Sequence, residues 1–334
     1  MTAAAPSTAW KEAKPEGEDA RFEVYAQRLA TLQRQHGGTS RALHAKGHGV
    51  FEATLEVADG VPEHARHGLF AKPARYEALV RFSNGSGKRQ ADKVGDVRGI
   101  AVKVLGVPGK KVLGEASTQD FLGILSSAVP FRTADEFVGV IWATRSPALA
   151  LFRLLGTIGP RAFPLLKKLL AGFKLPPASL ASKRFFSALP IQCGPYAARF
   201  AFTPTDTAAD PLAAGPDFHA EVLASRLRRG PVAYDLELQF FVDEATTPIE
   251  DPTVDWPTPY VKVGRLELSQ QDSASARGTQ LSERGERLSF DPWHALVEHQ
   301  PLGGMMRARK AAYFASITTR GASPEPASIA ALLG

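Results

Sequence analysis

The sequence predicts an α+β fold in which short strands outnumber helices. Several segments alternate polar and apolar residues with a period of two, and segments near both ends carry apolar residues at helical spacing. Glycine, proline or aspartate separates one strand segment from the next. About seven or eight strands with turns between them favour a sandwich or a closed barrel, and closure is the simpler way to remove exposed edges.

These periods place the elements along the 334 residues. Residues 1–20 are rich in alanine, proline, glutamate and lysine and predict a flexible arm, whereas residues 21–334 are expected to form a single domain. Helices are predicted over 22–35 and about 304–320, and the polar stretch 270–287 predicts a surface loop. The predicted strands cover 50–57, 79–83, 99–104, 118–131, 196–202, 232–242 and 260–268.

A segment of different composition, residues 137–190, interrupts the strands. No aspartate or glutamate occurs between positions 137 and 205, whereas nine lysines or arginines do. Helices are predicted over 149–155 and 162–173, and basic residues recur too often for a transmembrane span. We interpret the segment as packed helices with a solvated basic face. The alternative is that residues 145–184 form a surface that rests on anionic lipid or admits a lipid substrate.

Composition excludes several classes of protein. A content of 44% hydrophobic and 22% charged residues is that of a chain with a buried core, which excludes wholesale disorder and collagen-like repetition. The single cysteine, Cys193, excludes intrachain disulfides, thiolate zinc clusters, iron–sulfur sites and covalent c-type haem. The first residues lack the basic flank and apolar run of a secretory signal, so we expect a cytoplasmic protein. A net charge of +6 permits anionic partners without identifying one, and we expect no nucleic-acid partner.

Four short units carry residues suited to chemistry. Three of them combine a basic residue with a predicted strand, namely Arg41 to Gly47, Val80 to Gly85 and Asp96 to Lys103, and their spacing favours neighbouring positions in one sheet. Arg41 and Arg81 would then converge on a dianionic group. The fourth unit lies near the C-terminus, where helical spacing places Arg309, Tyr313 and Arg320 along one stripe. An arginine one turn from a phenol stabilises the phenolate, which is a strong anionic donor to ferric iron.

In this order and spacing, the four units resemble the haem catalase family. The matching segments are Arg41-x-x-His44-Ala45-Lys46-Gly47, Val80-Arg81-Phe82-Ser83, Arg98-Gly99-x-Ala101-Val102-Lys103 and Arg309-x-x-x-Tyr313 with Arg320. The chain looks most like the short catalase-like haem proteins, which lack the long wrapping segments and the C-terminal helical domain. Ser117-Thr118-Gln119-Asp120-Phe121 and Pro301-Leu302-Gly303-Gly304 also look like that subgroup. The resemblance covers residues 20–145 and 285–322, with a looser middle.

The resemblance implies a catalase-type closed antiparallel barrel of about eight strands, with inserted helices and a C-terminal proximal helix. It implies haem b as the cofactor, with Tyr313 as the ligand to iron and Arg309 holding that tyrosine as phenolate. Arg41, Arg81 and Arg320 would bind the haem propionates, because a planar guanidinium suits a carboxylate. Ligation by Cys193 and metal binding by the pair His64 and His67 are weaker alternatives, since neither has a matching signature or a further ligand.

On the opposite side of the haem, the resemblance implies a distal histidine. His44 would act as general acid and base on a peroxide, oriented by the Ser83 hydroxyl. Leu43, Phe121 and Phe131 would form the wall of the pocket and exclude water. The substrate would be hydrogen peroxide or an organic, for example fatty-acid, hydroperoxide.

The sequence departs from the catalase pattern at one distal residue. Catalases place an asparagine in the strand after the Arg-Gly-x-Ala-Val-Lys unit, but here that position falls at Leu125, Ser126 or Ser127. The chain has a single asparagine, Asn84, in another predicted strand. Loss of one preorganised donor costs about 10² to 10³ in rate, so we expect peroxidase or organic-hydroperoxide activity rather than fast disproportionation of hydrogen peroxide.

Two alternatives to an enzyme remain open. One is a haem-binding carrier or sensor without turnover, and the other is a barrel that has lost haem and binds lipid. The segments that lock catalase tetramers together are shortened, and we expect a homodimer.

Overall fold

The structure is a computed structural model that describes residues 4–35, 40–114, 116–143, 149–172, 179–208, 210 and 215–334. Its strands are β1 Gly47–Val57, β2 Ala74–Asn84, β3 Arg98–Val104, β4 Gln119–Ile124, β5 Phe185–Phe186, β6 Ile191–Cys193, β7 Tyr196–Pro204, β8 Val232–Phe240 and β9 Tyr260–Leu268. Its α-helices are α1 Glu18–Gln35, α2 Ala134–Ala143, α3 Ala150–Ile158, α4 Ala162–Gly172, α5 Phe218–Arg229, α6 Ala276–Arg287, α7 Gly304–Arg320 and α8 Ile329–Leu333. Short 3-10 helices are η1 Glu63–Ala65, η2 Gly68–Phe70, η4 Gly159–Arg161 and η5 Val297–His299.

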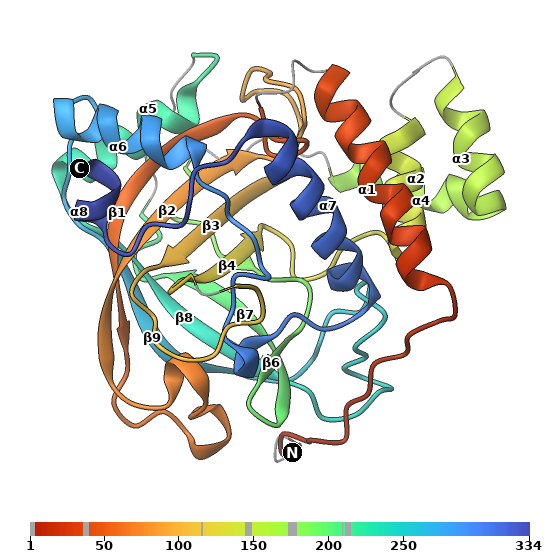
Figure 1. Cartoon of the computed structure of the whole chain (residues 1–334), viewed down its shortest axis with the longest axis horizontal. Helices are drawn as coiled ribbons and strands as arrows, with labels where there is room; N and C mark the ends of the chain where they lie inside the picture. Colours follow the sequence, from red (N-terminus) through yellow and green to blue (C-terminus); the bar gives the residue numbers. More distant parts are fainter. Residues whose placement is uncertain are drawn as a thin grey trace.

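The strands form one antiparallel sheet that closes into a barrel (Figure 1). Their order is β5-β4-β3-β2-β1-β9-β8-β7-β6, and a further pairing of β5 with β7 joins the two ends. Closure depends on the two residues of β5, because Phe186 pairs with Ile124 of β4 and Phe185 pairs with Phe202 of β7. Eight strands make the ring and β6 pairs with β7 outside it. The predicted closed antiparallel barrel is therefore confirmed.

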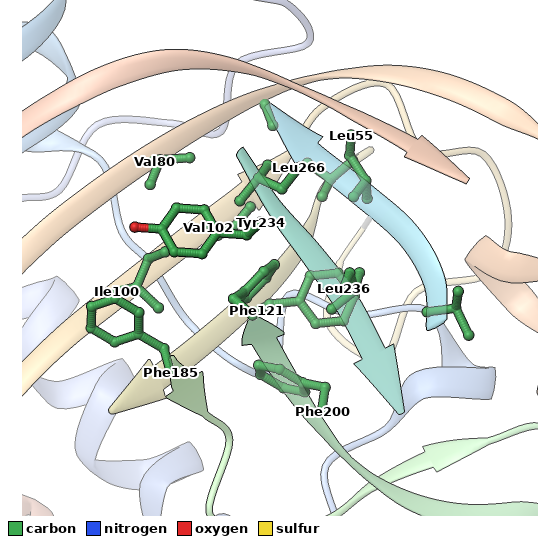
Figure 2. Packing of buried hydrophobic residues seen from close by; sticks show 14 of the residues in the cluster. Leu55, Val80, Ile100, Val102, Phe121, Phe185, Phe200, Tyr234, Leu236 and Leu266 are labelled. Atoms are coloured by element: carbon green, nitrogen blue, oxygen red, sulfur yellow. The ribbon is translucent and has the colours of Figure 1, made fainter. Parts of the chain in front are cut away.

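Aromatic and branched side chains fill the inside of the barrel (Figure 2). The rings of Phe121 and Phe200, from β4 and β7, have centroids 5.1 Å apart, and Val80 and Val102 belong to the same cluster. Because side chains alternate along a strand, the neighbours of these residues point outward. Leu79, next to Val80 on β2, belongs to a second cluster on the outer surface of the barrel.

Helices cover the outer surface of β1, β2 and β3. The proximal helix α7 packs mainly against α1, and the two helices run side by side along the barrel (Figure 1). Helices α6 and α8 bring Leu281 and Leu333 onto the outward-facing Leu79 of β2. The outward residues of β2 and β3 therefore lie under helices, which is the part of the fold that carries the candidate site.

The N-terminal segment lies along the barrel before α1 begins. The Ser7 amide donates to the Phe241 carbonyl at 2.9 Å, and the Trp10 indole donates to the Pro195 carbonyl at 2.9 Å. Helix α1 begins at Glu18, within the range of the predicted arm, and the mobility of that arm stays a prediction. The helix agrees with the prediction for 22–35, because Phe22, Ala26, Leu29 and Leu32 are buried on one face.

Two sequence predictions are wrong at the boundaries of elements. The polar stretch 270–287 contains a helix, α6, and not a loop. Its start is capped by Ser275, whose hydroxyl accepts from the Gly278 amide at 3.1 Å, and its buried side is only Leu281 and Gly285. Because only these two residues are buried, the sequence of this helix shows almost no periodic pattern of apolar residues. The strand predicted over 118–131 ends at Ile124.

The inserted segment contains α2, α3 and α4. Helices predicted over 149–155 and 162–173 correspond to α3 and α4. Helix α3 continues to Ile158, and η4, which contains Gly159 and Pro160, separates the two helices. Position 173 and positions 144–148 lie outside the described residues. The short strands β5 and β6 and the helix α5 were not predicted. Within the described ranges, no helix has the length and apolarity needed to cross a membrane.

Candidate functional site

His44 lies in the segment before β1 and is held in an uncommon backbone conformation. Its φ is +56°, in the left-handed region that non-glycine residues rarely adopt. The His44 amide donates to the Gly85 carbonyl at 2.9 Å, and the next amide, Ala45, donates to the Ser86 carbonyl at 3.0 Å. A conformation of this kind costs about 1 to 3 kcal/mol and persists where the surrounding contacts fix it, which happens most often at functional sites.

Ser83 orients the imidazole of His44. The Ser83 side chain points outward at the end of β2, and its Oγ lies 2.9 Å from His44 Nδ1. A hydroxyl can donate or accept, so this contact supports either tautomer of the ring. Nε2 is then the ring nitrogen available to a substrate.

A glycine on β3 makes room for the same imidazole. A Cβ added to Gly99 would lie 2.8 Å from His44 Cε1, which is too close. Gly99 pairs with Ile124 of β4, and cross-strand partners share a face of the sheet. Ile124 of β4 is therefore on the same face of the sheet as Gly99.

Burial and nearby positive charge keep His44 neutral. Burial is the larger cause, followed by the charges of Arg81, Arg309 and Arg41, and together they lower the pKa of His44 to about 3. The imidazole is therefore a free base over the whole physiological range. Arg320 at the end of α7 and Arg41 donate to the same Leu288 carbonyl, so α7 ends near the segment that carries His44.

The three predicted propionate-binding arginines gather around one carboxylate and one carbonyl. Arg81 Nε donates to Glu286 Oε1 at 2.7 Å, and Arg41 donates to Glu286 Oε2 at 2.7 Å. Arg41 and Arg320 both donate to the Leu288 carbonyl, at 2.8 and 2.7 Å. Burial and the charge of Arg81 lower the pKa of Arg41 to about 9 and also lower the pKa of Arg320. The three guanidinium groups share a single carboxylate, that of Glu286, so this part of the site carries a net positive charge.

Glu286, in the last turn of α6, was missed by the sequence reasoning. Burial alone would raise the pKa of Glu286, but Arg81 and Arg41 outweigh burial and lower it. Two glycines allow this approach, because a Cβ on Gly47 would lie 2.2 Å from Glu286 Oε1 and a Cβ on Gly285 would lie 2.7 Å from the Val50 side chain. An acidic residue in a polar stretch gives no signal in the sequence, since solvated loops and helices carry many of them.

The proximal pair lies on α7 as the helical spacing predicts. Arg309 donates to the Tyr313 hydroxyl at 2.8 Å, and its guanidinium carbon lies 5.1 Å from the centre of the tyrosine ring. Tyr313 is half-buried, and Met306 and Ala308 are the buried residues of this helix. The arginine thus presents a positive charge directly to the phenol oxygen.

The structure separates Phe121 from the other predicted site residues. Its ring lies inside the barrel beside Phe200 (Figure 2), whereas Ser83 and Arg81 point to the outer face. Phe131 is buried and packs edge-on against Phe137 with ring centroids 5.2 Å apart. Leu43 is half-buried beside His44 in the chain.

The single asparagine of the chain is bonded away from His44. Asn84 is fully buried; its Oδ1 lies 2.7 Å from His48 Nε2 and its Nδ2 donates to Asp92 at 3.0 Å. Of the residues considered for the distal position, Ser126 is exposed and donates to the Ala128 carbonyl at 2.6 Å. The asparagine amide is therefore committed to a separate buried network.

The alternative metal sites are weaker than the Tyr313 site. Cys193 is buried among apolar residues, and burial raises the pKa of its thiol to about 12, so the thiolate needed for ligation is disfavoured. His64 and His67 pack against the rings of Phe240 and Tyr196. In the described part of the chain, Asp120, His294 and Glu325 have metal-ligand spacing, but the Lys103 ammonium already lies within hydrogen-bond distance of both carboxylates.

The donor set fits a haem. A phenol paired with a guanidinium suits axial ligation, and a histidine with one nitrogen fixed by a hydroxyl suits the opposite face. The excess positive charge around Arg41, Arg81 and Arg320 suits two propionate carboxylates.

Comparisons with known proteins show what the chain is similar to. No family model matches the sequence. The chain is 30% identical over 302 residues to the catalase-related peroxidase of Mycolicibacterium paratuberculosis, a match that covers 84% of this chain and 88% of that protein.

Three solved catalases have the same fold. A fungal catalase has a TM-score of 0.66 at 18% identity, covering 96% of this chain and 66% of its own. A bacterial catalase has 0.64 at 19% identity, covering 94% and 63%, and catalase A from Saccharomyces cerevisiae has 0.67 at 18% identity, covering 95% and 67%. The chain thus spans about two thirds of the length of these catalases.

Proposed function

Because this chain belongs to the catalase superfamily and resembles a catalase-related peroxidase over most of its length, we propose that it is a haem-dependent peroxidase acting on hydroperoxides. The observation that supports the proposal is the Arg309–Tyr313 pair on α7 together with the His44–Ser83 pair, because α7 ends near the segment that carries His44. An axial donor and an acid–base group on opposite sides of one site are what hydroperoxide cleavage at a haem requires.

Tyr313, Arg309 and the three arginines Arg41, Arg81 and Arg320 would hold the haem. Tyr313 would offer its phenol oxygen to the iron, and the Arg309 guanidinium donates a hydrogen bond to that oxygen at 2.8 Å. Arg41, Arg81 and Arg320 would bind the propionates. When bound, haem supplies the redox chemistry that splits the O–O bond.

His44 would move the proton. Its low pKa leaves Nε2 ready to accept a proton from the inner oxygen of a hydroperoxide and to return that proton to the outer oxygen as it leaves. Ser83 serves both steps, because its hydroxyl can accept from Nδ1–H or donate to bare Nδ1 as the tautomer changes. The ring does not need to rotate between the two steps.

The surroundings of His44 favour organic hydroperoxides over hydrogen peroxide. Ile124 is on the same face of the sheet as Gly99, which contacts the imidazole, and the amide of Asn84 is bonded to His48 and Asp92, so neither residue offers an amide donor to the distal side. Missing one preorganised donor costs about 10² to 10³ in rate. An alkyl group on the substrate would gain contact with such an apolar face.

Three assays on the haem-loaded protein test the proposal: oxygen release from hydrogen peroxide, oxidation of a peroxidase dye, and consumption of a fatty-acid hydroperoxide. We expect activity in the last two, and a loss of at least about 10²-fold in His44→Ala with haem content unchanged. His67→Ala, a half-buried histidine outside the site, is the matched control and should retain activity. Equal activity of His44→Ala and wild type would contradict the assignment.

The second candidate function is a haem carrier or sensor without turnover. The sequestered amide of Asn84 favours it, because catalytic preorganisation is reduced while the haem-binding groups are retained. Intact haem together with no activity in any of the three assays would support the carrier and contradict the peroxidase.

A further inference from the structure

The exposed large apolar side chains of the protein concentrate on α3 and α4. Phe152 of α3 is 74% exposed and Phe163 of α4 is 58% exposed. Three leucines from the same two helices and their N-terminal flank are also exposed: Leu149, Leu151 and Leu166. Exposed apolar patches on soluble proteins commonly mark surfaces that bind a partner or a membrane.

The helices that carry these side chains stand away from the barrel. Within the described residues, α3 packs mainly on α2, and α4 packs on α3 and η4 (Figure 1). Each helix has a buried side of its own, with Leu154 on α3 and Leu165 on α4. Phe152 and Phe163 are therefore not among the buried side chains through which α3 and α4 pack.

The charge around this surface has one sign. No acidic residue occurs between positions 137 and 205, while Lys167 is exposed on α4 and Arg161 is 56% exposed in the turn between the helices. Glu136 of α2, an acidic residue that contacts the surface, is buried and bonded to Arg161 at 2.7 Å. Apolar side chains with a basic rim are typical of segments that lie in the interface of an anionic membrane.

From these observations we propose that α3 and α4 form a docking surface for an anionic lipid bilayer. A second copy of this chain fits less well, because a two-fold symmetric contact would place the basic residues of one copy against those of the other. A bilayer with acidic headgroups offers the complementary charge and an apolar layer for Phe152 and Phe163. This surface is carried by other elements than the candidate site and goes beyond the proposed peroxidase function.

Vesicle cosedimentation with the full-length protein tests the proposal. The vesicles are phosphatidylcholine alone and phosphatidylcholine mixed with phosphatidylglycerol in equal parts. We expect binding to the mixed vesicles that weakens with added salt, and at least a tenfold loss when both Phe152→Glu and Phe163→Glu are present. Phe314→Glu is the matched control, because Phe314 is 73% exposed on α7, and it should bind like wild type.

Several results would overturn the proposal. The wild type could fail to bind the mixed vesicles, or it could bind both vesicle types equally. The Phe314→Glu control could also lose as much vesicle binding as the double variant. Light scattering after size-exclusion chromatography adds a further check. If the double variant turns a dimer into a monomer while wild type does not bind vesicles, the surface is an interface between two copies.

Discussion

Replacing Lys103 by methionine should destabilise the protein more than any surface substitution. Lys103 of β3 is fully buried, and its ammonium lies 2.8 and 2.7 Å from the two oxygens of Asp120 on β4 and also contacts Glu325 from the C-terminal segment. Burial alone would lower the pKa of Lys103, but the two carboxylates outweigh burial and raise it. The lysine is therefore charged, and its loss would leave the buried carboxylate of Asp120 and the half-buried carboxylate of Glu325 facing each other.

The size of the effect follows from that geometry. Removing one partner of a buried, hydrogen-bonded ion pair costs about 3 to 5 kcal/mol. For a chain of this length the entropy of unfolding corresponds to roughly 0.7 kcal/mol per degree, so the apparent Tm should fall by about 4 to 7 °C. Urea unfolding followed by circular dichroism and scanning calorimetry measure the two quantities.

Control variants separate the ion pair from general effects of the substitution. Lys72→Met, at an exposed position, should change the free energy of unfolding by less than about 0.5 kcal/mol. Adding Asp120→Asn to Lys103→Met should restore part of the loss, since one uncompensated charge is removed. A loss below about 1 kcal/mol for Lys103→Met alone would refute this reasoning.

Three further predictions concern the site and the buried histidines. Gly99→Ala should displace the His44 imidazole and lower peroxidase activity while haem content stays constant, because its Cβ would lie 2.8 Å from Cε1; unchanged activity would show that the ring can move at no cost. Glu286→Gln should loosen Arg81 and Arg41 and weaken haem retention, measured as the rate of haem transfer to apomyoglobin, and a rate equal to wild type would contradict a positioning role for the carboxylate. Burial lowers the folded-state pKa values of three histidines from their ordinary value. The free energy of unfolding should therefore be at its full value above about pH 6.5 and should decrease as the pH falls towards 4. The expected loss is on the order of 1 to 2 kcal/mol for each histidine at about pH 5. An apparent Tm that stays flat over this interval would contradict that sign; the pKa values are lowered to about 4 for His48 and His299 and to about 3 for His219.

The motif residues were predictable because their chemistry depends on short-range spacing. Helical periodicity alone places Arg309 one turn from Tyr313, and the structure has their side chains in contact. The long alternating strands were likewise visible as runs with a period of two. The resemblance, rather than the periods, selected a closed barrel over a sandwich.

The remaining features depend on contacts between residues far apart in the chain. β5 closes the barrel with only two residues, which is too short for a periodic signal. Glu286 reaches Arg81 because Gly47 and Gly285 remove side chains from its path, a condition that one segment of sequence does not reveal. The sequence also did not reveal that Phe121 and Ser83 point to opposite faces of the sheet, because this depends on the register of β2, β3 and β4.

The central claim is that the Tyr313 oxygen binds haem iron on the side opposite His44. The most direct measurement is the absorption spectrum of the haem-loaded protein before and after Tyr313→Phe. We predict a high-spin ferric spectrum with charge-transfer bands that disappear in the variant. A spectrum unchanged by the substitution would contradict the claim and place the iron on another ligand.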